Sequence, residues 1–180
     1  MEYFKHINLP SWPMLQKFCY ESWDKKFTQV HIFKGLDIRY IAQLVEKDLL
    51  QLLGQQYKVK SAIMFINDAY FEQEIHIDGF NIDRKDASNT ALNIPILNCE
   101  TSPMFWLDGK YKLKQQDTQM PLSYLQLDWE TEPTIVANAV INQPTVVRID
   151  VPHCIKNLTD SPRLMLSIRF VNDIPLVNIP

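Results

Sequence analysis

The chain has 180 residues, of which 46% are hydrophobic and 22% charged, so it can bury one sizeable core and is too short for two ordinary domains. Its formal net charge of -3 provides no broad cationic field, which argues against bulk binding of nucleic acid or of an anionic membrane surface. The three cysteines, Cys19, Cys99 and Cys154, are widely spaced and form no CxxC pair, which argues against a disulfide framework and favours a reducing, cytoplasmic setting.

The first third of the chain carries helical patterns. A helix is expected over residues 12–25, and its candidates for a buried side are Met14, Phe18 and Trp23. A second helix is expected to begin after Asp37, whose side chain can cap it, and to end at Gly54. Its apolar positions follow the 3.6-residue period: Ile38, Ile41, Ala42, Val45, Leu49 and Leu52. No run of residues is apolar for long enough to predict a signal peptide or a membrane span.

After Gly54 the sequence changes to short runs of β-branched and aromatic residues separated by turn residues, which predicts strands. Strands are expected at 59–66, 70–77, 91–97, 104–107, 124–127, 134–141, 145–149 and 163–171. Residues 107–110 predict a turn, and residues 110–121 predict an exposed polar loop. Strands of this number and length favour a jelly roll over a parallel α/β sheet, which would need interleaved helices. We therefore predict one mainly β domain over 1–180, with a helical N-terminal portion over 1–57 and a double-stranded β-helix (jelly-roll, cupin-like) over 58–180.

His76 and Asp78 stand two residues apart near the end of an expected strand. Residues i and i+2 of a strand project from the same face, so both side chains can reach one metal ion. The alternative is a partly exposed strand end at which Asp78 begins a turn. A second histidine, His153, follows another expected strand and lies 75 residues beyond Asp78 (153 minus 78). Taken alone, it is typical of a hydrogen-bonded structural histidine.

The expected strand at the C-terminal end alternates cleanly between two kinds of side chain. One face carries Arg163, Met165, Ser167 and Arg169, and the other carries Leu164, Leu166, Ile168 and Phe170. Arginines directed into a small barrel are costly unless an anion meets them, and a dicarboxylate ligand would offset that cost.

With these residues the sequence resembles the Fe(II)/2-oxoglutarate-dependent oxygenase superfamily, whose members share the pattern H-x-D, then a distant H, then an arginine. The matching residues are His76, Asp78, His153 and Arg163, the last two being ten residues apart (163 minus 153). The resemblance covers about residues 63–170, and the helical first third carries no matching motif. It implies that the two imidazoles and the carboxylate hold Fe(II) and leave open positions for 2-oxoglutarate and O2.

The resemblance also implies that the C5 carboxylate of 2-oxoglutarate pairs with Arg163, and that the reaction releases succinate and CO2. Hydroxylation is the commonest outcome in the family, and no catalytic residue beyond the metal ligands is expected. Arg169 is the alternative anchor, because Met165 stands where several branches of the family have a serine. Asn93 is a further candidate for contacting the co-substrate, or else a buried amide bonded to main chain. Trp106 is a candidate for lining a substrate pocket, although such aromatic residues more often belong to the core.

Two other functions remain open. One is a non-catalytic jelly-roll module for binding or structure, coat-like or lectin-like, in which the histidines are incidental. The other is a cupin-like isomerase or dioxygenase that holds Zn, Mn or Fe in the same ligands without 2-oxoglutarate. The expected substrate is a small molecule or a peptide side chain. An amino-acid side chain or derivative is preferred, because residues 153–170 resemble the aspartyl/asparaginyl and prolyl hydroxylase branches. The sequence leaves the oligomeric state open.

Overall fold

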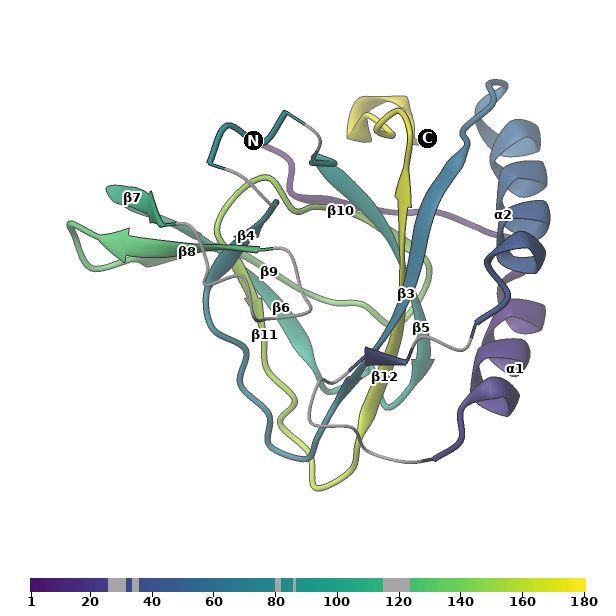
Figure 1. Cartoon of the computed structure of the whole chain (residues 1–180), viewed down its shortest axis with the longest axis horizontal. Helices are drawn as coiled ribbons and strands as arrows, with labels where there is room; N and C mark the ends of the chain where they lie inside the picture. Colours follow the sequence, from purple (N-terminus) through teal and green to yellow (C-terminus); the bar gives the residue numbers. More distant parts are fainter. Residues whose placement is uncertain (26–31, 34–35, 80–81, 86, 115–123) are drawn as a thin grey trace.

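The computed structural model describes residues 1–25, 32–33, 36–79, 82–85, 87–114 and 124–180. Across these residues, two helices cover one face of a pair of antiparallel six-stranded sheets (Figure 1). The first sheet has the order β1 (Phe4–His6), β10 (Thr145–Arg148), β5 (Thr90–Leu97), β12 (Arg163–Phe170), β3 (Val59–Asn67) and β2 (Ile32–Phe33). The second has the order β7 (Tyr111–Lys114), β8 (Tyr124–Trp129), β4 (His76–Asp78), β11 (His153–Ile155), β6 (Pro103–Asp108) and β9 (Thr134–Val140).

From β3 to β12 the chain passes repeatedly between the two sheets. Strands β3, β5, β10 and β12 lie in the first sheet, and β4, β6, β9 and β11 lie in the second. This path brings β4 and β11 side by side although they are far apart in the sequence. The prediction of a mainly β protein with N-terminal helices is thus confirmed.

Strand β12 lies in the first sheet between β3 and β5 and shows the expected alternation. Its residues Leu164, Leu166 and Ile168 belong to the core that the first sheet forms with the helices. Met165 belongs instead to the core between the two sheets. The polar residues of β12 share the face of Met165, so they point toward the second sheet.

Helix α2 (Ile38–Leu53) forms as its sequence predicts. The carboxylate of Asp37 accepts hydrogen bonds from the backbone N–H groups of Arg39 and Tyr40, and Gly54 ends the helix with a left-handed φ of 70°. Helix α1 (Trp12–Ser22) ends earlier than expected, because the backbone is already extended at Trp23.

The buried side of α1 differs in part from the expectation. Trp23 is buried and Phe18 packs at the edge of the core, but Met14 is 52% exposed. Leu15 and Cys19 occupy the centre of the buried side instead, one turn apart. No helix in the part of the chain that the structure describes is long and apolar enough to cross a membrane.

The expected strand over 70–77 was wrong in its first part, since only β4 is a strand there. Tyr70 adopts a left-handed φ of 54°, and Glu72 forms an isolated bridge to Lys156. Four short strands were not expected: β1, β2, β7 and β11. Residues 111–114 of the expected loop form β7, while residues 115–121 of that loop lie outside the described residues.

The two helix starts give a matched pair of substitutions. Asp37→Ala removes a side-chain cap and should lower the free energy of unfolding by about 1 kcal/mol. Ser11→Ala should leave it unchanged or raise it slightly, because among the described residues the Ser11 hydroxyl is buried without a hydrogen-bond partner. Urea unfolding followed by circular dichroism measures both. An equal loss in the two variants would contradict the assigned cap.

Candidate metal centre

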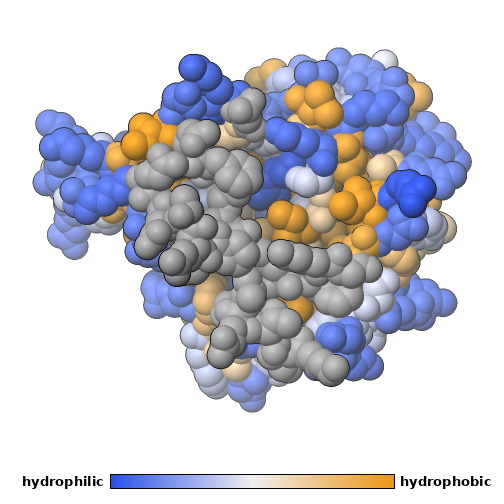
Figure 2. Space-filling model, viewed as in Figure 1, coloured by the Kyte–Doolittle hydropathy of each residue, from blue (hydrophilic) through white to orange (hydrophobic). Residues whose placement is uncertain are grey.

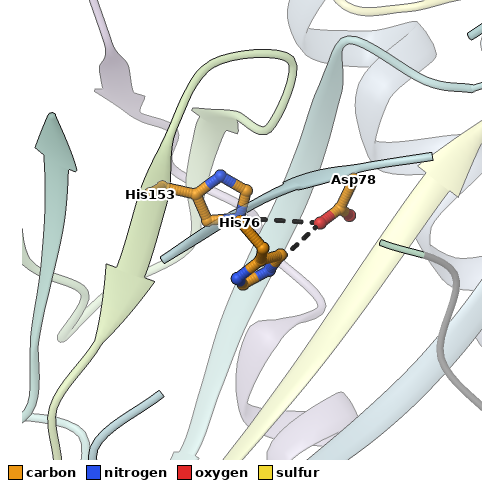
Figure 3. A group of neighbouring side chains, drawn as sticks. All are labelled: His76, Asp78 and His153. Atoms are coloured by element: carbon orange, nitrogen blue, oxygen red, sulfur yellow. Dashed lines mark ion pairs between the residues drawn. The ribbon is translucent and has the colours of Figure 1, made fainter. Parts of the chain in front are cut away.

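His76, Asp78 and His153 meet on the inner face of the second sheet (Figure 3). His76 and His153 are direct partners across β4 and β11. Asp78 lies two residues further along β4, on the same face as His76. One ligand atom from each of the three residues lies within 4.8 Å of the other two. In particular, Oδ1 of Asp78 is 3.5 Å from Nε2 of each histidine.

Backbone carbonyl groups orient both imidazoles. Nδ1 of His76 lies 2.8 Å from the carbonyl oxygen of Glu74, and Nδ1 of His153 lies 2.9 Å from that of Val151. A carbonyl oxygen can only accept, so each Nδ1 carries the hydrogen and each Nε2 offers a lone pair to the metal position. In both cases the acceptor stands two residues earlier in the chain, so the local backbone path sets the ring orientation.

The electrostatics keep Asp78 and His153 in the protonation states that bind metals. Burial alone would raise the pKa of Asp78, but the charge of Arg169, together with the adjoining His153 and His76, outweighs burial and holds that pKa well below its usual value. Burial, together with the neighbouring His76, lowers the pKa of His153 despite the opposing effect of Asp78. The site therefore offers a carboxylate and a neutral imidazole without first having to release protons.

Two neutral imidazoles and one carboxylate converging from one side are the donor set typical of non-haem Fe(II) sites, which keep open positions on the other side. The side chains of His76 and His153 are only 6% and 5% exposed, whereas that of Asp78 is 20% exposed. The residues present therefore fit iron.

Arg163 is fully buried between the sheets, and only part of its guanidinium is satisfied. Its Nη1 donates to Oδ1 of Asn67 at 2.7 Å, while Nε and Nη2 have no hydrogen-bond partner among the described residues. Burial lowers the pKa of Arg163, an effect that the nearby Cys99 partly opposes. The Cys99 thiol points its hydrogen at the carbonyl oxygens of Leu97 and Leu164. A buried cation with two free donors is suited to binding an anion.

Arg169 and Asn93 lie in one chain of polar contacts that crosses from sheet to sheet. Nη2 of Arg169 donates to Oδ2 of Asp78 at 2.6 Å, and Nη1 donates to Oγ of Ser167 at 2.5 Å. Ser167 in turn donates to Oδ1 of Asn93, its partner residue across β12 and β5. The side-chain amide oxygen of Asn93 thus holds Ser167 in place, and Arg169 holds Asp78 in place.

Trp106 lies in the core between the two sheets. Its ring is fully buried, stacks against Phe4 with centroids 5.5 Å apart, and donates its indole N–H to the carbonyl oxygen of Arg148 at 2.9 Å. This placement agrees with the core alternative that the sequence allowed, and contact of Trp106 with a substrate stays a prediction.

Three neighbours of the site were missed in the sequence. Asn67 is the partner residue of Arg163 across β3 and β12, and a polar residue at the end of an otherwise apolar run could have drawn attention to it. Tyr124 and Gln126 gave no signal, because their position beside Asp78 and His76 depends on the pairing of β8 with β4.

No protein-family model and no curated protein sequence matches the chain. Solved structures do match it. The non-haem α-ketoglutarate-dependent carbocyclase SnoK from nogalamycin biosynthesis gives a TM-score of 0.53 at 14% identity, over 95% of this chain and 80% of SnoK. The epimerase SnoN, solved in complex with Fe3+, α-ketoglutarate and nogalamycin RO, gives 0.55 at 12% identity, over 95% of this chain and 79% of SnoN.

At these identities the likeness establishes the fold, which this chain shares with non-haem enzymes dependent on α-ketoglutarate, that is, 2-oxoglutarate. The resemblance seen in the sequence is therefore confirmed at this level. The His-Asp-His group is compatible with the same superfamily.

The protonation states of the site make the stability of the metal-free protein depend on pH. The pKa of His153 lies below 6.5 when folded, so the unfolded chain binds more protons around that value and acidification favours unfolding. The free energy of unfolding should therefore fall between about pH 7.5 and about pH 5.5.

Urea titrations at the two pH values measure this slope. His153→Gln should flatten it, whereas the same change at the exposed His6 should not. An unaltered slope in the His153 variant would contradict the assigned electrostatics.

Proposed function

We propose that this chain is a non-haem Fe(II)- and 2-oxoglutarate-dependent oxygenase. The observation that carries the proposal is the combination of three converged ligand atoms with a buried arginine that has two free donors in the described structure. When bound, iron and 2-oxoglutarate would supply the activation of O2, with oxidation of a substrate C–H bond and release of succinate and CO2.

The strand order supports the finer fold assignment, a double-stranded β-helix. Eight of the described strands form two four-stranded sets, one in each sheet. Their orders are β10-β5-β12-β3 and β4-β11-β6-β9. Both sets are antiparallel throughout, and the metal group lies on the face of one set that is turned toward the other. A jelly roll places its ligand site between two such sheets.

Arg163, rather than Arg169, would anchor the co-substrate. The guanidinium of Arg169 already donates to Asp78 and Ser167, whereas Nε and Nη2 of Arg163 have no partner in the described part of the chain. A guanidinium edge with two parallel N–H groups matches a carboxylate. The two arginines share a face of β12 and are six residues apart (169 minus 163), so Arg163 lies further along the strand from Asp78 than Arg169 does.

Arg169 would act as a positioning residue for the metal. Its bond to Oδ2 of Asp78 leaves Oδ1 directed at the position between the two histidines. The carboxylate then offers the metal a single oxygen, which preserves open coordination positions for the reaction.

Hydroxylation is the outcome we propose for the reaction. SnoK and SnoN are described as a carbocyclase and an epimerase, so their shared fold supports other C–H oxidations as well. We also propose a small-molecule substrate, because SnoN was solved with nogalamycin RO.

Uncoupled turnover tests this proposal without the substrate. Aerobic protein with Fe(II), ascorbate and 2-oxoglutarate should release succinate slowly, as measured by mass spectrometry. His76→Ala should abolish both succinate release and tight Fe(II) binding, whereas His6→Ala should preserve both, since His6 contacts Thr145 outside the metal group. Metal binding without 2-oxoglutarate binding would instead favour the cupin-like metalloenzyme. Absence of metal binding would favour the non-catalytic module.

Two arginine variants separate the anchor from the positioning residue. Arg163→Met should lower 2-oxoglutarate affinity by about 30-fold or more, equivalent to about 2 kcal/mol, while Fe(II) still binds. Its unfolding free energy should not fall, because an incompletely paired buried charge is removed. Arg169→Gln should weaken Fe(II) binding by about 10- to 100-fold.

Anaerobic calorimetry measures both affinities. Arg148→Gln is the matched control, because it breaks another partly buried arginine–aspartate pair of 2.6 Å outside the metal group. If Arg163→Met and Arg169→Gln exchanged their expected effects, the two assignments would have to be reversed.

A further inference from the structure

The two flanks of the metal group on the second sheet differ in character. On one flank β6 places Trp106 opposite His153, and that side chain is fully buried in the core. On the other flank β8 places Gln126 opposite His76 and Tyr124 opposite Asp78, and both of these residues are only partly buried. Among the described residues, the inner face of the sheet is therefore closed beside His153 and only partly covered beside β4.

Tyr124 is the next ring outward from the metal group. The His76 ring lies 4.4 Å from the His153 ring and 4.9 Å from the Tyr124 ring, measured between centroids. The Tyr124 and His76 planes are inclined at 55°, so the phenol ring leans over the metal-binding histidine. A molecule that approaches the metal over β8 would meet this ring.

Strand β8 turns a polar face to the metal side. Cross-strand partners project from the same face of a sheet, so Tyr124, Gln126 and Asp128 share the face of His76, while Leu125 and Leu127 point the other way. Nε2 of Gln126 lies 3.4 Å from a carboxylate oxygen of Glu74, a weak hydrogen bond beside the metal ligand.

The charges further out along the hairpin of β7 and β8 are compensated. Lys114 pairs with Asp128 at 3.4 Å, and Lys112 pairs with Glu130 at 2.8 Å. The hairpin projects from the body of the protein and is largely hydrophilic on the face drawn in Figure 2. The groups of this hairpin nearest to the metal ligands are thus a ring and a neutral amide.

We propose that the face of β8 carrying Tyr124 and Gln126 is the wall against which the substrate lies, and that these two residues determine substrate specificity. The inference rests on the proposed oxygenase function. The ring offers a surface for a substrate carbon skeleton, and the amide, beside Glu74, offers hydrogen bonds to a polar group of a small molecule. Neither residue binds the metal, so both can vary without altering the ligand set.

The position of this wall can be tested by identifying which residue of the protein is oxidised when no substrate is present. With Fe(II), 2-oxoglutarate and O2, one oxygen atom enters succinate as CO2 leaves. The other replaces a ring hydrogen of Tyr124 by a hydroxyl group. Mass spectrometry of the digested protein should therefore find one added oxygen in the peptide that contains Tyr124. Tyr111 is the internal control, because it lies on the opposite face of the same hairpin, paired with Trp129.

Variants test whether oxidation depends on the face of β8 that carries Tyr124 and Gln126, rather than on Tyr124 alone. Tyr124→Leu should remove the added oxygen from the β8 peptide, and Tyr111→Leu should leave it in place. In the Tyr124→Leu background, Gln126→Tyr should restore oxidation on β8, whereas Leu127→Tyr, on the opposite face, should not. Anaerobic Fe(II) titration of each variant shows whether the metal site is intact.

The outcomes separate the two proposals. If the wild-type protein releases no succinate, the oxygenase function fails. If it releases succinate and the oxygen is found on the closed flank, on β12 or on no residue of β8, the oxygenase stands and the wall is overturned. Oxidation at Tyr124, and at position 126 but not 127, supports the wall.

Discussion

The ion pair between Arg169 and Asp78 is the contact on which the site depends. It joins the central region of the first sheet to the short strand of the second sheet that carries two of the three ligands. Removing both charges from water is costly, and the 2.6 Å contact together with the bond from Arg169 to Ser167 offsets much of that cost. Because Asp78 is held from the opposite sheet, the distance between the sheets and the geometry of the ligands are fixed together.

The interior between the sheets contains two arginines in different electrostatic states. Arg169 is neutralised by a carboxylate of the chain itself, whereas the partners of Arg163 among the described residues are the amide oxygen of Asn67 and a neighbouring thiol. In the described part of the chain this cation has no carboxylate partner, and an uncompensated buried charge lowers stability. An anion bound beside Arg163 would offset that cost and stabilise the folded chain.

Much of the site could be predicted because its chemistry is local in sequence. The spacing of His76 and Asp78, the alternation around Arg163 and the capped helix after Asp37 are patterns of a few residues each. What could not be predicted depends on pairing between remote strands. Tyr124 approaches the metal only because β8 pairs with β4, and Trp106 is buried because β1 and β6 meet across the core.

In the sequence, the hairpin of β7 and β8 lies between β6 and β9. In the second sheet, however, β8 pairs with β4. The hairpin is an insertion in the chain, yet in the described structure β4 pairs with β8 at three residues and with β11 at one. It therefore contributes most of the pairing of the strand that carries His76 and Asp78. A change in this insertion that shifts the register of β8 would also shift β4, and with it the distance between Asp78 and His153. Mutation or grafting of the hairpin and preservation of the candidate metal centre are therefore mechanically linked through a single three-residue strand.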